Sequence, residues 1–135
     1  MEAPPATSVS RVLFVCGHNA GRSIAAEAIA TKLRPDLVVR SGGTVPSGTI
    51  NPKMKEALEE HGYSTSGLFS KAHDDATVGG YENGYDLIIT MGCMDGQCPW
   101  TKSIPRVDWG LPDPAADASV IPAVIRRIEE CVRAL

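Results

Sequence analysis

The segment from Arg11 to Leu33 constrains the fold of this chain more than any other, because it indicates a strand, a tight loop and a helix in direct succession. Residues 12–15 form an apolar, partly β-branched run, which suits a strand buried on both faces. Cys16 ends that run, a loop with two glycines and one asparagine follows, and Arg22 and Ser23 open an apolar helix. This succession is typical of the first unit of a parallel α/β sheet.

The loop has the composition of an anion-binding site, with the spacing C-x5-R-S over Cys16, Arg22 and Ser23. Successive loop N–H groups can converge on one oxyanion, and the start of the helix adds a partial positive charge. Arg22 can bind two oxygens of the same anion. The same surroundings would stabilise a thiolate at Cys16.

The pattern therefore predicts a nucleophilic thiolate beneath a bound tetrahedral oxyanion. The predicted substrate-binding residues are those of the loop: Gly17, His18, Asn19, Ala20, Gly21, Arg22 and Ser23. The alternative is a buried cysteine at the end of a strand, with Arg22 as an ordinary surface charge. The predicted strand before the loop and the predicted helix after it favour the functional interpretation.

The size and composition of the chain favour one catalytic domain over residues 11–135, preceded by a disordered lead-in over residues 1–10 that is rich in Pro, Ala, Ser and Thr. A net charge of -3 and a pI of about 5.5 imply no surface for nucleic acid. The apolar runs are short and no secretory signal is visible, so we expect no membrane contact and a cytoplasmic location. In that compartment the 4 cysteines favour metal or redox chemistry over permanent disulfides.

The rest of the chain alternates short strands with helices. We expect strands over residues 37–39, 86–91 and 104–107, and helices over residues 22–33, 51–61 and 119–134, with one short helix within residues 70–78. The apolar residues of the first helix recur on one side of it. This alternation predicts an α/β, single-domain three-layer sandwich: a four-stranded parallel sheet with helices on both faces.

Three chemically distinctive segments follow predicted strands, and ligands of such sheets bind beyond the carboxyl ends of the strands. They are Cys16 with its loop, the segment from Cys93 to Cys98, and the loop over residues 108–117. The stretch over residues 41–44 also leaves the sheet near the Cys16 loop if the crossover is right-handed. We therefore expect one site at this edge of the sheet.

Cys93 and Cys98 lie in a glycine-containing loop directly after the predicted strand 86–91. The spacing C-x4-C differs from a C-x2-C zinc knuckle and no matching histidine pair exists, so no structural zinc is expected. The pair can form a disulfide if the loop rearranges to bring the Cα atoms within about 6 Å, and thiols near an activated thiolate suit thiol–disulfide exchange. The alternative is two unrelated loop thiols. Residues 73–75 favour an acidic solvated loop over a metal site, so neither metal nor cofactor is predicted, and Cys131 is expected in the core.

Asp113 lies between Pro112 and Pro114, which restrict the backbone on both sides of it. An acid in a rigid loop facing the anion site can protonate a leaving oxygen, so Asp113 is the predicted general acid. The alternative is a turn aspartate beside proline.

These motifs resemble those of the low-molecular-weight protein tyrosine phosphatase superfamily and, within it, of the thioredoxin-coupled arsenate reductases. The resemblance covers nearly the whole chain after Ser10. VLFVCGHNAGRS is similar to the reductase form of the loop, because the phosphatase form usually carries Gly, Cys and Pro where this chain has His18, Gly21 and Ile24. Phosphatases also tend to carry an aromatic residue at the position of Ala115. TMGCMDGQCP resembles the reductase segment that supplies two redox cysteines.

The resemblance implies a low-molecular-weight phosphatase-like domain that reduces arsenate, with phosphate and sulfate as competing oxyanions. The Cys16 thiolate would attack arsenate held by the loop and Arg22, and Asp113 would protonate the departing oxygen. Ser23 would steady the thiolate, and Asn19 would fix the shape of the loop.

The resemblance also implies a disulfide relay. Cys93 would attack Cys16 and release arsenite, and Cys98 would then attack Cys93 to give a Cys93–Cys98 disulfide that thioredoxin reduces. Related reductases use mycothiol and mycoredoxin instead, and the sequence does not decide between the two. A monomer is the default.

Some reductases bind potassium behind the loop through an Asn, a Glu, a Ser and an Asp. Asn19, Glu27 and Ser41 match three of these positions, but residues 66–70 offer no acid, so no potassium site is expected. Two other functions stay open. One is a phosphatase of protein or small phosphotyrosine substrates, and the other is a non-catalytic protein that binds an oxyanion or arsenite.

Overall fold

The computed structural model describes residues 10–72, 84–92, 104–112, 114 and 117–135, and the lead-in over residues 1–9 lies outside this part. The described elements run in this order: β1 (Arg11–Cys16), α1 (Arg22–Leu33), β2 (Val38–Gly43), α2 (Pro52–Glu60), β3 (Leu87–Thr90), β4 (Arg106–Asp108), the 3-10 helix η2 (Ala118–Val120) and α3 (Ile121–Arg133). The predicted strands and the three long helices are therefore confirmed, with shifts at their ends. The short helix predicted over residues 70–78 does not begin where expected, because residues 70–72 are not helical and Ala72 forms a parallel bridge with Gly43; the rest of that segment lies outside the described residues.

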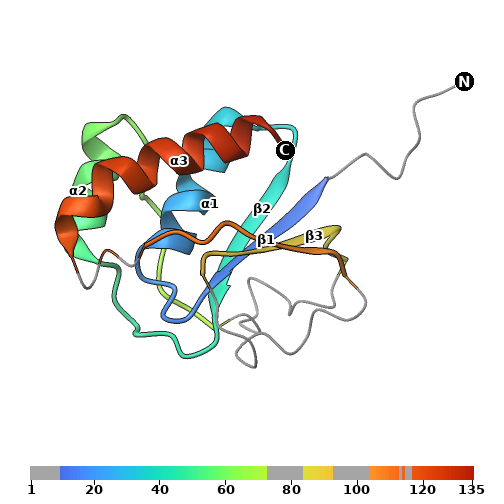
Figure 1. The fold of residues 1–135 in the computed structure, drawn as a ribbon, viewed down its shortest axis with the longest axis horizontal. Coiled ribbons are helices and arrows are strands. Elements are labelled where there is room, and N and C mark those ends of the chain that lie inside the picture. The colour runs from blue at the N-terminus through green and yellow to red at the C-terminus, as the bar shows by residue number, and fades with distance from the viewer. Residues whose placement is uncertain (1–9, 73–83, 93–103, 113, 115–116) are drawn as a thin grey trace, which may run out of the picture.

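The described strands form one parallel sheet in the order β2-β1-β3-β4 (Figure 1). β1 lies inside the sheet, and its residues 12–15 are fully buried. The register sets Cys16 beside Gly43 of β2 and Val15 beside Thr90 of β3. Because the strands are parallel, their carboxyl ends meet at one edge, as the sequence predicts for the site.

The helices α1, α2 and α3 cover one face of the sheet. α1 packs on β1 and β2, and α3 lies along α1 and α2 (Figure 1). The opposite face carries a second apolar cluster, with Leu13, Val15 and Ile88 packed around Tyr85 and Ile104. The α/β class and the parallel sheet are confirmed, while a helical layer over this second face stays a prediction.

α1 departs from the one-sided helix that the sequence predicts, because all residues from Ser23 to Ala30 are buried. Its run of alanines has small side chains on every side, so the sheet, α2 and α3 can all approach it closely. One consequence is that Glu27, in the middle of this helix, is a buried carboxylate.

α2 begins as its sequence predicts. The Asn51 side chain accepts hydrogen bonds from the backbone N–H groups of Lys53 at 3.0 Å and Met54 at 3.3 Å, and Pro52 occupies the first turn. Gly62 follows the helix with φ of 85°, the left-handed conformation that ends many helices.

α3 packs its apolar side on α1 through Val124, Ile125 and Ile128. The expectation that Cys131 lies in the core is wrong: Cys131 is partly exposed, and Val132 is the fully buried residue of this turn. The apolar pattern fits either Cys131 or Val132 as the buried residue of this turn, and the orientation of α3 on α1 places Val132 inside. In the described part of the chain, no helix is long and apolar enough to cross a membrane.

Candidate active site

The loop over residues 17–21 joins β1 to α1, and three of its carbonyl groups accept hydrogen bonds from residues 45–51. The carbonyl of Gly17 accepts from Val45 N–H at 2.8 Å, that of His18 from Ser47 N–H at 3.1 Å, and that of Ala20 from Asn51 N–H at 2.8 Å. In a trans peptide the N–H points opposite to the carbonyl. The N–H groups of residues 18, 19 and 21 are therefore turned toward the inside of the loop, as an oxyanion site requires.

The inside of the loop is a small pocket lined by Cys16, His18, Ala20, Gly21, Arg22, Asn51 and Pro114. Most of these come from the predicted loop. Pro114 comes from the loop over residues 108–117, which was expected at this edge of the sheet, whereas the place of Asn51, the N-cap of α2, was not predicted. The pocket can hold an anion against the thiol of Cys16 and the first turn of α1.

The thiol of Cys16 is buried and belongs to a chain of hydrogen bonds. Its Sγ lies 2.9 Å from Ser23 Oγ, and Asn19 Nδ2 donates to the same oxygen at 2.7 Å. Asn19 Oδ1 accepts from the backbone N–H of Lys71 at 2.9 Å, which fixes the orientation of the amide. Because the Ser23 oxygen accepts from Asn19, its own hydrogen is available for Cys16, and a hydroxyl that donates to sulfur favours the thiolate.

The backbone of the loop is strained at Asn19, which is fully buried with φ of 48°. Asparagine tolerates this left-handed conformation better than most residues. Gly43 at the end of β2 supports the same turn, because a Cβ there would lie 2.7 Å from the Gly17 carbonyl and 3.1 Å from Asn19. The sequence motif does not include Gly43, although its glycine pair after a predicted strand is a usable signal.

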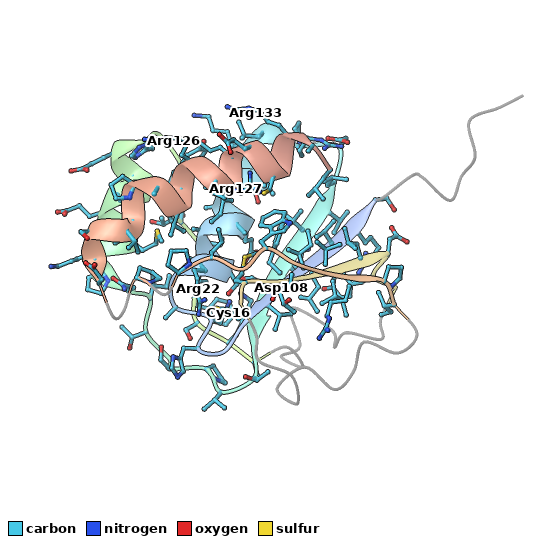
Figure 2. All side chains as sticks on the ribbon, viewed as in Figure 1. Cys16, Arg22, Asp108, Arg126, Arg127 and Arg133 are labelled. Carbon is cyan, nitrogen blue, oxygen red and sulfur yellow. The ribbon has the colours of Figure 1, made fainter. Side chains whose placement is uncertain are left out.

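Arg22 is held beside the pocket by two segments that follow β3 and β4. Its Nη1 donates to the carbonyl of Met91 and, at 2.9 Å, to the carbonyl of Leu111. Figure 2 shows Arg22 and Cys16 at the same end of α1. Gly92 leaves room for this arginine, since its φ is 103° and a Cβ would lie 3.0 Å from Nη1. The guanidinium is therefore fixed by backbone groups at the predicted edge of the sheet.

Asp108 is a further site-supporting residue that sequence reasoning missed. Its Oδ1 accepts from the N–H of Gly92 at 2.7 Å and from the N–H of Gly110 at 3.1 Å. The position of Asp108 is labelled in Figure 2. Gly92 directly precedes Cys93, so Asp108 anchors the start of the segment that carries the second thiol. A lone aspartate at the end of a predicted strand gave no signal for this role.

Three predicted site residues, Cys93, Cys98 and Asp113, lie outside the described residues, as do residues 73–75 and Ala115. Their neighbours are described. Gly92 leaves room for the Arg22 guanidinium, and Pro114 lines the pocket and leaves little space for a side chain at Gly21. The redox roles of the two cysteines and the acid role of Asp113 stay predictions.

A parallel α/β sheet whose first strand ends in a cysteine, an anion-binding loop and a helix defines a cysteine-dependent oxyanion-processing enzyme. The model of the low molecular weight phosphotyrosine protein phosphatase family matches residues 11–135. The chain belongs to this family.

Curated relatives and solved structures narrow the resemblance. The chain is 34% identical over 107 residues to arsenate reductase 2 of Staphylococcus haemolyticus, covering 77% of this chain and 78% of that protein. It is similar to the structure of an arsenate reductase in the phosphate binding state, with 29% identity, a TM-score of 0.79 and coverage of 93% and 95%. It is also similar to a thioredoxin-dependent arsenate reductase of Corynebacterium glutamicum, with 34% identity and a TM-score of 0.70, covering 96% of this chain and 61% of that one.

Proposed function

We propose that this enzyme is an arsenate reductase that uses Cys16 as nucleophile and a relay over Cys93 and Cys98. The observation that carries the proposal is the Asn19–Ser23–Cys16 hydrogen-bond chain at the base of the loop pocket. The relatives named above are arsenate reductases, and one of them is described in a phosphate-binding state, which supports a tetrahedral oxyanion as ligand. Arsenate is such an anion, and phosphate and sulfate are its expected competitors.

In the first step the Cys16 thiolate attacks arsenic(V), an S–As bond forms, and one oxygen leaves as water after Asp113 protonates it. The loop N–H groups and Arg22 hold the remaining oxygens. In the second step the Cys93 thiolate attacks Cys16 Sγ, so an S–S bond forms and the S–As bond breaks. The bonding electron pair stays on arsenic, which leaves as arsenite, As(III).

The relay ends when Cys98 attacks Cys93, frees the Cys16 thiolate and leaves a Cys93–Cys98 disulfide. Thioredoxin is the proposed reductant, supported by the 34% identity to a thioredoxin-dependent reductase. Mycothiol with mycoredoxin is the alternative electron source. Either system belongs to the cytoplasm, where protein thiols stay reduced, so the proposal assigns the enzyme to that compartment. A monomer is the proposed oligomeric state.

Phosphotyrosine hydrolysis is the second candidate, because the family is described by that activity and the C-x5-R loop can bind phosphate. The loop differs from the phosphatase form at His18, Gly21 and Ile24, and these differences favour the reductase. Rapid hydrolysis of an aryl phosphate that Cys98→Ser leaves unchanged would favour the phosphatase.

A trapping experiment tests the relay. Cys98→Ser protein is mixed with arsenate and analysed by mass spectrometry after alkylation of its free thiols. We expect a Cys16–Cys93 disulfide and one arsenite per protein, and adding Cys131→Ser to the Cys98→Ser protein should change neither result. Folded Cys98→Ser protein that keeps every thiol free after exposure to arsenate would contradict the relay.

A further inference from the structure

A buried pair of opposite charges lies behind the loop and takes no part in the chemistry described above. The Nζ of Lys71 lies 3.5 Å from Glu27 Oε1 on α1, and the Lys71 and Glu27 side chains are only 4% and 12% exposed. Ser41 of β2 is fully buried and completes the cluster: its hydroxyl donates to Glu27 Oε1 at 2.5 Å and accepts from Lys71 Nζ at 3.4 Å. The Lys71 ammonium also donates to the Phe69 carbonyl at 3.2 Å.

Such a pair calls for an explanation beyond stability. Lysine and glutamate are seldom buried unless they are paired, and the desolvation of both ions offsets much of their attraction. Apolar residues of similar volume often serve stability equally well. The best-attested use of a buried pair is to fix one arrangement of the surrounding segments.

The backbone of Lys71 connects this pair to the nucleophile. Its N–H donates to Asn19 Oδ1 at 2.9 Å, and its carbonyl accepts from the N–H of Gly43 at 2.9 Å. Asn19 in turn orients Ser23 toward Cys16. The side chain of Lys71 is therefore anchored on α1 and β2, while its main chain holds the amide that sets the direction of the hydrogen bond at sulfur.

We propose that Lys71 is a positioning residue: its ammonium, held by Glu27 and Ser41, serves as a built-in cation behind the loop and fixes the Asn19 amide that keeps the Cys16 thiolate ready to react. The proposal deepens the proposed function and rests on it for its role in arsenate reduction.

The test measures the reactivity of Cys16 alone and needs no arsenate. In a Cys93→Ser/Cys98→Ser/Cys131→Ser background, the rate of alkylation of Cys16 by iodoacetamide is recorded against pH. Lys71→Met removes the ammonium and keeps the length of the side chain. Lys55→Met is the matched control, since Lys55 forms an ion pair with Glu59 at 2.9 Å that is exposed on α2.

For Lys71→Met we expect alkylation at neutral pH to slow by up to about tenfold and the rate profile to move to higher pH, because the donor to the thiolate is no longer held in place. Lys55→Met should keep the starting profile, and Lys71→Arg should keep most of it because the positive charge remains. If Lys71→Met does not fold, the Glu27→Gln/Lys71→Met double variant, which leaves no unpaired charge, is measured instead and should show the same displacement.

A folded Lys71→Met or double variant with the unaltered alkylation profile would overturn the proposal and leave Lys71 a purely structural residue. The proposal would also be overturned if Lys55→Met moved the alkylation profile as far as Lys71→Met does. Arsenate turnover is assayed separately on chains with all cysteines present. Loss of the proposed function would appear there as absent turnover with a normal alkylation profile, so the two failures can be told apart.

Discussion

Replacing Gly43 by alanine should disable the site, although Gly43 has no side chain that touches substrate. The new Cβ would lie 2.7 Å from the Gly17 carbonyl oxygen and 3.1 Å from both the Cβ and the N of Asn19. Ordinary contacts begin at 3.4 Å, so the loop and β2 must separate by roughly 0.7 Å. Neither side yields easily, because Gly17 and Asn19 are bound by hydrogen bonds and Gly43 is paired with Cys16 in the sheet.

Overpacking of this kind costs about 1–3 kcal/mol of the free energy of unfolding. A displacement approaching 1 Å at a reacting group can cost on the order of 100-fold in rate, so we expect kcat/KM for arsenate to fall by at least about tenfold. Urea unfolding and arsenite formation are the assays. Gly17→Ala is the control for stability, because a Cβ there meets no atom within 4 Å. Gly43→Ala protein with the stability and kcat/KM of the starting enzyme would refute the reasoning.

Three further predictions concern stability. Hydrogen bonds from the backbone and hydroxyl of Ser10 lower the pKa of Asp86. The ionised carboxylate therefore stabilises the fold at neutral pH, and this stabilisation is lost as the pH falls through the folded-state pKa. Asp86→Asn should be less stable than the starting protein at pH 7, and urea unfolding should show that the difference in stability shrinks below about pH 4. Burial, with a hydrogen bond to Glu129, raises the pKa of Tyr63 to about 12, so the stability of the fold should fall from pH 10 to 12. In thermal unfolding, Tyr63→Phe should lose less stability over that range than the starting protein. An equal loss of stability in the two proteins would contradict this prediction. Asn51→Ala removes the α2 cap and should lower the free energy of unfolding by about 1 kcal/mol in a urea titration, whereas Thr49→Ala, which removes no cap, should not.

The loop and its nucleophile could be predicted from sequence because they are local. The start of α1 follows from the glycine-containing loop that ends at Gly21, and the start of α2 follows from the cap at Asn51. Cys16, Arg22 and Ser23 converge because the fold of one short segment brings them together. Their identities and spacing carry the chemistry before any tertiary contact is known.

The supports of the loop could not be predicted, because their roles depend on contacts between distant segments. Lys71 stands in a polar stretch where a lysine indicates solvent, and only the bridge between Ala72 and Gly43 at the end of β2 brings it to Glu27. Asp108 acts through the backbone of Gly92 on the neighbouring strand. The rotation that exposes Cys131 and buries Val132 depends on how α3 meets α1, which periodicity leaves undetermined by one residue.

The most direct test of the account is arsenate-dependent oxidation of NADPH in the presence of thioredoxin and thioredoxin reductase, measured on the unsubstituted protein and on Cys98→Ser. The account predicts turnover for the unsubstituted protein, with one arsenite formed per NADPH oxidised. It predicts loss of turnover in Cys98→Ser, since the Cys93–Cys98 disulfide can no longer form. Turnover that survives in Cys98→Ser would mean that an external thiol resolves the intermediate. Folded protein with free thiols that forms no arsenite with thioredoxin, or with mycothiol and mycoredoxin, would contradict the central claim.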